Sequence, residues 1–268
     1  MKFRRLITGA ATAALVLGAS LLGPAGAAAQ PAAAAEVYVA LGDSYSSGVG
    51  AGNYDSGSGN CKRSANAYPQ QWAAANSPSA FHFTACSGAR TTDVLANQLG
   101  PLNSSTTLVS ISIGGNDAGF ADAMQTCVLQ STASCVNRMG VANNYISNTL
   151  PAQLDSVYSE IRSRAPQARV VVLGYPRIYQ LNGSCIVGIS EQARGAINNT
   201  ANHLSDITSK RAADHGFSYG DVRSAFTGHE ICSSSPWLHS VTFPIGDSYH
   251  PTAAGQTGGY LPVFASHA

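Results

Sequence analysis

The residues best suited to chemistry are a serine near one end of the chain and a histidine near the other. Ser44 lies within residues 42–48 (GDSYSSG), directly after an apolar segment at 37–41. A serine just beyond a short buried strand is a position at which an α/β fold can expose a nucleophile. Asp247 stands three residues before His250. A serine, a histidine that accepts its proton and an acid that orients the histidine together perform acyl transfer.

Acyl transfer also needs donors that stabilise the negatively charged oxygen of the tetrahedral intermediate. Gly88 follows an apolar segment at 81–85, and Asn116 follows another at 107–113. Because ligands bind beyond the carboxyl ends of parallel strands, we expect both residues to lie near Ser44. The backbone N–H groups of Ser44 and Gly88 and the side-chain amide of Asn116 form the expected oxyanion hole.

Simpler structural interpretations exist for the same residues. Serine is a favoured helix N-cap, and Asn116 after two glycines has the composition of a turn. We expect Asp43 to be structural, because alternation along a strand points it away from Ser44. A trypsin-like protease is excluded because serine precedes histidine and because strands alternate with helices. The G-x-S-x-G elbow is excluded because the next glycine comes four residues after Ser44.

Short apolar segments alternate with helical patterns along the chain. The helical pattern is strongest at 145–164, where apolar residues recur every three or four positions. Such alternation predicts a parallel sheet covered on both faces, which is a three-layer α/β/α sandwich. Thr91 or Thr92 is the expected cap of the second helix. The predicted strands are 37–41, 81–85, 107–113, 170–173 and 217–220, and the predicted helices are 66–76, 91–98, 118–129, 145–164, 190–214 and one after Pro251.

The first 34 residues have the composition of an export signal. Lys2, Arg4 and Arg5 precede an apolar stretch at 6–22, and small residues follow. A membrane anchor is the alternative, but polar interruptions and Pro24 favour cleavage. Cleavage near residue 34 leaves residues 35–268, long enough for a single domain. No later segment is apolar enough to span a membrane, so we expect a secreted, extracellular protein.

The charge of the remaining chain argues against one class of partner. The signal holds three of the 15 basic residues and none of the 14 acidic ones, so residues 35–268 carry a net charge of about −2. Nucleic acid is not an expected partner, because the chain has no basic stripe.

Six cysteines after an export signal predict disulfides. Zinc is the alternative, but no C-x-x-C or Cys/His cluster has ligand spacing. Six cysteines allow fifteen pairings, and their positions alone do not choose among them. The cysteines are Cys61, Cys86, Cys127, Cys135, Cys185 and Cys232.

Four ordered motifs resemble those of the SGNH (GDSL-type) hydrolases, and in particular secreted actinobacterial lipases and esterases. The motifs are GDSYSSG (42–48), CSGART (86–91), SIGGND (112–117) and DSYHP (247–251). The resemblance implies the flavodoxin-like SGNH hydrolase fold, with a central five-stranded parallel sheet. It also implies hydrolysis of lipid or aryl esters, with Ser44 as nucleophile, His250 as base, and Gly88 and Asn116 in the oxyanion hole. Disulfides between cysteines adjacent in sequence are implied as well.

Several features remain open at this stage. Asp247 could orient His250 through its carboxylate or through its backbone carbonyl. A phospholipase, a carbohydrate deacetylase and a catalytically silent binding module are the alternatives to a lipase or esterase. We expect a monomer that needs no metal or cofactor and contacts lipid surfaces only transiently. The loops at 48–60 and 182–189 are the expected lining of an acyl groove.

Overall fold

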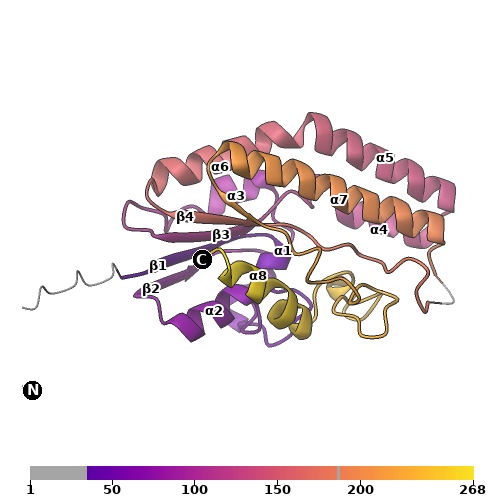
Figure 1. Ribbon diagram of the computed structural model, residues 1–268, viewed down its shortest axis with the longest axis horizontal. Helices are drawn as coiled ribbons and strands as arrows, with labels where there is room; N and C mark the ends of the chain where they lie inside the picture. The colour runs from indigo at the N-terminus through magenta and orange to yellow at the C-terminus, as the bar shows by residue number, and fades with distance from the viewer. Residues whose placement is uncertain (1–34, 186–187) are drawn as a thin grey trace, which may run out of the picture. The chain divides into compact units, whose positions relative to one another are not determined.

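A five-stranded parallel sheet forms the centre of residues 35–268 (Figure 1). The computed structural model describes residues 35–185 and 188–268, so the predicted signal segment 1–34 lies outside the described residues. The strand order is β2-β1-β3-β4-β5, with every neighbouring pair parallel. All five predicted strands are confirmed: β1 (Val37–Gly42), β2 (Ala80–Phe83), β3 (Leu108–Ser112), β4 (Arg169–Leu173) and β5 (Ser218–Gly220).

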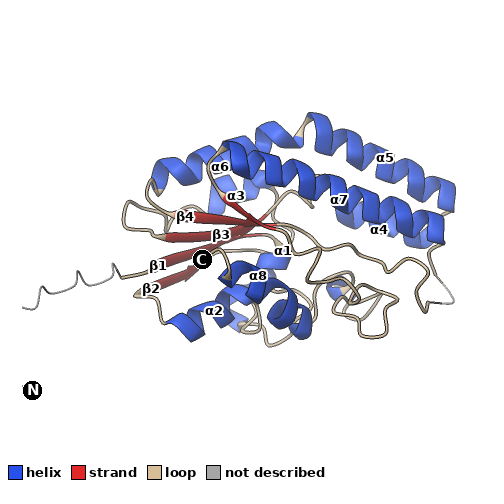
Figure 2. Cartoon of the chain, in the orientation of Figure 1, coloured by secondary structure: helices blue, strands red, loops and turns tan. Residues whose placement is uncertain are grey.

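Helices cover both faces of the sheet, so the predicted three-layer sandwich is confirmed (Figure 2). On one face lie α2 and α8; on the other lie α3, α6 and α7, with α5 packed on α7. The α-helices are α1 (Ser44–Ser47), α2 (Tyr68–Asn76), α3 (Thr91–Asn97), α4 (Phe120–Leu129), α5 (Thr132–Asn148), α6 (Leu150–Arg164), α7 (Glu191–Asp214) and α8 (Leu261–Ala265). The 3-10 helices are η1 (Ser56–Cys61) and η2 (Ile245–Asp247), and η3 (Gly255–Tyr260) is a π-helix that continues into α8.

The central strands are buried on both faces, and most of their residues are apolar. On one face the ring of Tyr38 contacts Trp72 of α2 and Phe264 of α8. The Tyr38 hydroxyl bonds to the Ser110 hydroxyl over 2.7 Å, which satisfies both polar groups inside the core. The parallel pairing of β1 with β3 places the carboxyl ends of both strands at the same edge of the sheet.

The predicted helix 145–164 is wrong in its boundaries. The structure has two helices there, α5 and α6, which meet at Thr149. Pro151 explains the break, because proline lacks a backbone N–H and its ring clashes with the preceding turn of a continuous helix. The first residue of α5 follows Ser131, whose hydroxyl caps the Ser134 N–H at 3.1 Å.

Three disulfides join the cysteines that are adjacent in sequence, which confirms the pairing implied by the resemblance. They are Cys61–Cys86, Cys127–Cys135 and Cys185–Cys232. The first ties the loop after α1 to the segment that carries Gly88, and the second ties α4 to α5. In the described part of the chain, no helix is both long and apolar enough to cross a bilayer.

Candidate active site

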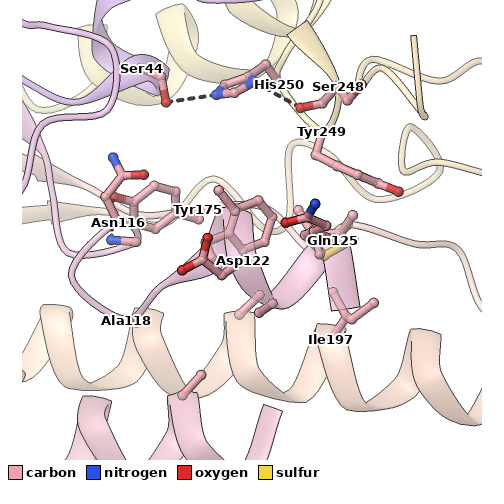
Figure 3. A pocket seen from close by; sticks show the side chains of 18 of the residues that line it. Ser44, Asn116, Ala118, Asp122, Gln125, Tyr175, Ile197, Ser248, Tyr249 and His250 are labelled. Atoms are coloured by element: carbon pink, nitrogen blue, oxygen red, sulfur yellow. Dashed lines mark hydrogen bonds between the residues drawn. The ribbon is translucent and has the colours of Figure 1, made fainter. Parts of the chain in front are cut away.

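The end of β1 places Ser44 at the edge of the sheet. Gly42 has φ of 124°, a left-handed conformation that glycine tolerates, and a Cβ there would lie 2.5 Å from the Ser112 carbonyl oxygen. Asp43 caps α1 by accepting the Tyr45 N–H at 3.0 Å. Ser44 is therefore the first residue of the helix, and its hydroxyl faces His250 (Figure 3).

The Ser44 hydroxyl and the His250 imidazole are in direct contact. Ser44 Oγ lies 2.8 Å from Nε2, and Nδ1 lies 3.0 Å from the backbone carbonyl oxygen of Ser248. A carbonyl oxygen can only accept, so Nδ1 carries the proton and Nε2 is left free to accept the serine proton. The Tyr45 hydroxyl donates to the Tyr249 carbonyl at 2.7 Å and holds the histidine segment against α1.

Asp247 does not occupy the position that we predicted for it. Its carboxylate accepts from the Tyr54 hydroxyl at 3.3 Å and from Lys62 Nζ at 3.4 Å. Its backbone carbonyl accepts the His250 N–H at 3.3 Å, so neither of its acceptors is the partner of Nδ1. The turn formed by η2 explains the difference, because it presents the carbonyl of Ser248 to the ring and directs the Asp247 side chain toward the loop at 54–62.

The electrostatic environment keeps His250 neutral. The half-buried position of the imidazole lowers its pKa to about 4, because burial disfavours the charged form. The Ser248 carbonyl and the charge of Asp247 oppose this shift, and the cation of Lys62 adds to it. At neutral pH the ring is therefore an unprotonated base.

The residues that carry the three expected oxyanion donors are Ser44, Gly88 and Asn116, and all three line the same cavity as His250. The Ser44 N–H is the first of its helix and so has no partner within the helix. Gly88 has φ of 78°, which only glycine adopts without strain, and its N–H belongs to the segment next to the Cys61–Cys86 disulfide. Asn116 Nδ2 donates one hydrogen to the Ala89 carbonyl at 3.0 Å, and its second hydrogen remains available.

A cavity of about 600 Å³ extends from Ser44, and its lining is mostly apolar. Helices α4, α5 and α7 form its walls. The prediction that the loops at 48–60 and 182–189 line it is wrong for their described residues; residues 186–187 lie outside the described residues. Examples from the three helices are Met124, Ile146 and Ile197. A cavity of this size and lining suits an apolar organic group.

Comparison with known proteins agrees with this geometry. The model of the GDSL-like lipase/acylhydrolase family matches residues 40–257. The chain belongs to this family. It is 63% identical to Lipase 1 of Streptomyces coelicolor over 264 residues, which cover 98% of each chain.

Two solved structures resemble this family member over most of its length. Phospholipase A1 from Streptomyces albidoflavus is 66% identical with a TM-score of 0.86, covering 88% of this chain and 100% of that one. The extracellular lipase from Streptomyces rimosus is 64% identical with the same TM-score, covering 87% and 100%. These matches establish that the chain is an ester hydrolase with the predicted fold.

Gln98 helps to position the site of this hydrolase and gave no sequence signal. Gln98 accepts the Gly42 N–H at 2.7 Å and donates to the Gly42 carbonyl at 2.9 Å, so it holds the end of β1. Asp43 is structural, as expected: it accepts from Ser112 Oγ at 2.7 Å and from the Tyr175 hydroxyl. Burial raises the pKa of Asp43 to about 6.

The cap of α3 also differs from the prediction. The Asp117 carboxylate accepts the Thr91 N–H at 3.1 Å and the Thr91 hydroxyl at 2.6 Å. Thr91 is therefore the first residue of the helix and not its cap, because an acid from another segment supplies the acceptor. The same contact fixes Asn116, the neighbour of Asp117, against the segment that carries Gly88.

Proposed function

We propose that this hydrolase is an exported serine lipase that cleaves long-chain carboxylic esters through an acyl-enzyme on Ser44. One observation carries the proposal: Ser44 Oγ contacts His250 Nε2 at 2.8 Å, at the end of an apolar cavity of about 600 Å³. The contact supplies a nucleophile with its base, and the cavity supplies room for an acyl chain.

In the first half of the reaction, Ser44 Oγ attacks the ester carbonyl and its proton passes to Nε2 of His250. The carbonyl oxygen becomes an oxyanion, which accepts from the N–H groups of Ser44 and Gly88 and from Asn116 Nδ2. The imidazolium is stabilised by the Ser248 carbonyl on Nδ1–H. When the tetrahedral intermediate collapses, the bond to the alcohol oxygen breaks, and that oxygen takes the proton from Nε2.

In the second half, water replaces the alcohol. Nε2 accepts one proton of the water as its oxygen attacks the acyl carbon, and the same donors stabilise the second oxyanion. The bond between the acyl carbon and Ser44 Oγ then breaks, Oγ recovers its proton from Nε2, and the carboxylic acid leaves. These residues perform every proton transfer, so the proposed reaction requires no metal or cofactor.

The cavity favours a lipid ester over a short acyl group. Each buried methylene contributes about 0.8 kcal/mol, or roughly fourfold in kcat/KM. A carbohydrate acetyl ester would leave most of the apolar wall unused, so the cavity argues against a deacetylase. A phospholipid is the second candidate, favoured by the 66% identity to a phospholipase A1. A catalytically silent module is not supported, because the relatives named above are two lipases and a phospholipase.

Export is supported by two features besides the predicted signal at 1–34. All six cysteines form disulfides, which persist in oxidising compartments. The similar structure from Streptomyces rimosus is that of an extracellular lipase. Residues 35–268 are then the mature, single-domain enzyme. That it acts as a monomer without nucleic-acid partners stays a prediction.

Two measurements test the proposal. A fluorophosphonate probe should label the protein on Ser44, and the Ser44→Ala variant should lose both the label and more than about 10⁴-fold of kcat. The second measurement compares kcat/KM across p-nitrophenyl esters from acetyl to palmitoyl, with an optimum expected at eight carbons or longer. An optimum at acetyl would contradict the lipid-ester assignment, and an unlabelled folded protein would contradict the serine mechanism.

A further inference from the structure

Exposed apolar side chains gather in two segments of the surface. Among the described residues, eight large apolar side chains are exposed, and five of them fall within 128–129 and 241–245. Phe243 is 91% exposed and Leu129 is 71% exposed. We call these five residues the rim: Val128, Leu129, Val241, Phe243 and Ile245. Exposed apolar residues are normally scattered singly over a protein surface, whereas a cluster of them marks a contact surface.

The acyl cavity opens to the surface among the rim residues, because four of the five line it and are also exposed. Val128 and Leu129 from the end of α4 and Val241 and Ile245 from the loop before His250 all line that cavity. Phe243 lies between the last two in sequence and does not line the cavity. The apolar lining therefore continues outward onto the surface, and the exposed Phe243 stands in the same loop as the cavity-lining Val241 and Ile245.

The rim segments carry no charge. Residues 127–134 and 240–246 contain no Asp, Glu, Lys or Arg. A surface that binds anionic lipid uses clusters of Lys and Arg, whereas an uncharged apolar surface gains affinity only from burial. The charges next to the rim are the Asp247–Lys62 ion pair and the exposed Asp122 on α4, so no cluster of Lys and Arg adjoins it. The rim therefore fits an uncharged lipid surface better than an anionic one.

We propose that the rim docks this enzyme onto the surface of zwitterionic phospholipid, with Phe243 inserting between the acyl chains. A protein seated on the rim would close the entrance that the substrate must use. A lipid surface covers the same residues and at the same time supplies the ester, so it is the occupant that is compatible with turnover. This inference rests on the proposed function, since it takes the cavity to be the acyl site.

The test compares Phe243→Ser with the matched control Val141→Ser. Val141 is a 62% exposed apolar residue on α5 that lies outside the cavity lining. Binding is measured with vesicles of ether-linked phosphatidylcholine, which the enzyme cannot hydrolyse. We expect Phe243→Ser to weaken vesicle binding about tenfold and Val141→Ser to change it less than twofold. Phe243→Trp should bind as well as the parent, with a blue-shifted emission when vesicles are added.

Activity measurements separate docking from catalysis. With a short soluble ester, kcat/KM should stay within twofold for Phe243→Ser, while hydrolysis of a long-chain ester carried in vesicles of ether-linked phosphatidylcholine falls about tenfold. Equal vesicle binding by the two serine variants, no vesicle binding by the parent, or binding that requires anionic lipid would overturn the docking proposal. So would a dimer of the parent that Phe243→Ser dissociates. If the parent has no activity on the soluble ester, the proposed function is overturned, and the result of the vesicle-binding measurement still stands.

Discussion

Replacement of Asp247 by asparagine tests the most specific feature of the proposed mechanism. The Nδ1–H of His250 is held at 3.0 Å by the Ser248 carbonyl, a backbone group that the substitution leaves in place. Asp247 acts on the ring only through its charge, and Lys62 offsets that charge from 3.4 Å. A partly exposed ion pair of this kind contributes about 0–1 kcal/mol. We therefore expect kcat/KM to fall at most about fivefold.

The size of the rate loss in Asp247→Asn shows whether the Asp247 carboxylate or the Ser248 carbonyl supports His250. An acid that orients the histidine of a triad costs about 10⁴ in kcat when it becomes an amide. Asp247 raises the pKa of His250, so its neutral replacement should lower that pKa and move the acid limb of the rate profile to lower pH. The assay is kcat/KM for a soluble p-nitrophenyl ester between pH 3.5 and 9.

Controls and refutation follow from the same contacts. Asp214→Asn removes a surface carboxylate that pairs with Lys210 at 2.7 Å, and it should leave both the rate and the acid limb unchanged. Lys62→Met should move the acid limb in the direction opposite to Asp247→Asn. A loss above 10³-fold in a folded Asp247→Asn protein would show that the carboxylate, and not the Ser248 carbonyl, supports the imidazole.

Four other measurements test the site and its support. His250 must be neutral to accept the serine proton, so its pKa of about 4 predicts that kcat/KM for a soluble ester declines only near pH 4; a decline centred at 6.5 would refute this. Asn116→Ala should lower kcat about 10²–10³-fold with little change in KM, and a loss confined to KM would remove it from the oxyanion hole. The double variant Cys127→Ser/Cys135→Ser opens an 8-residue link and should cost about 2.5 kcal/mol of unfolding free energy, or roughly 5–10 °C in Tm by calorimetry. The pKa of Asp43 is raised to about 6. Its contribution to the free energy of unfolding is therefore complete below about pH 3.8 and is lost as the pH rises through 6. Between pH 3.5 and 7, the free energy of unfolding of Asp43→Asn should therefore rise by about 3 kcal/mol relative to that of the parent, as measured by urea titrations. A difference between the two proteins that does not change with pH would contradict the raised pKa.

The local sequence predicted the strands well, and it predicted that the motif residues follow the ends of those strands. Both features depend on residues that are neighbours in sequence. The apolar residues of β3 and β4 indicated buried strands, and the glycine pair after β3 allows the chain to turn toward the site. Gly88 and Asn116 were predicted together because the carboxyl ends of parallel strands share one edge. The break before α6 was missed, because the apolar spacing continues across Thr149 although the helix does not.

The amino-acid sequence by itself predicted that Ser44, Gly88, Asn116 and His250 share one site, and all four line the same cavity. The tertiary structure alone decided what surrounds them. The choice of the Ser248 carbonyl over Asp247 depends on how η2 turns the chain and on Tyr54 and Lys62, which lie about two hundred residues away in sequence. The cavity walls and the rim likewise come from helices and loops whose side chains meet only after folding, and such contacts leave no local pattern to read.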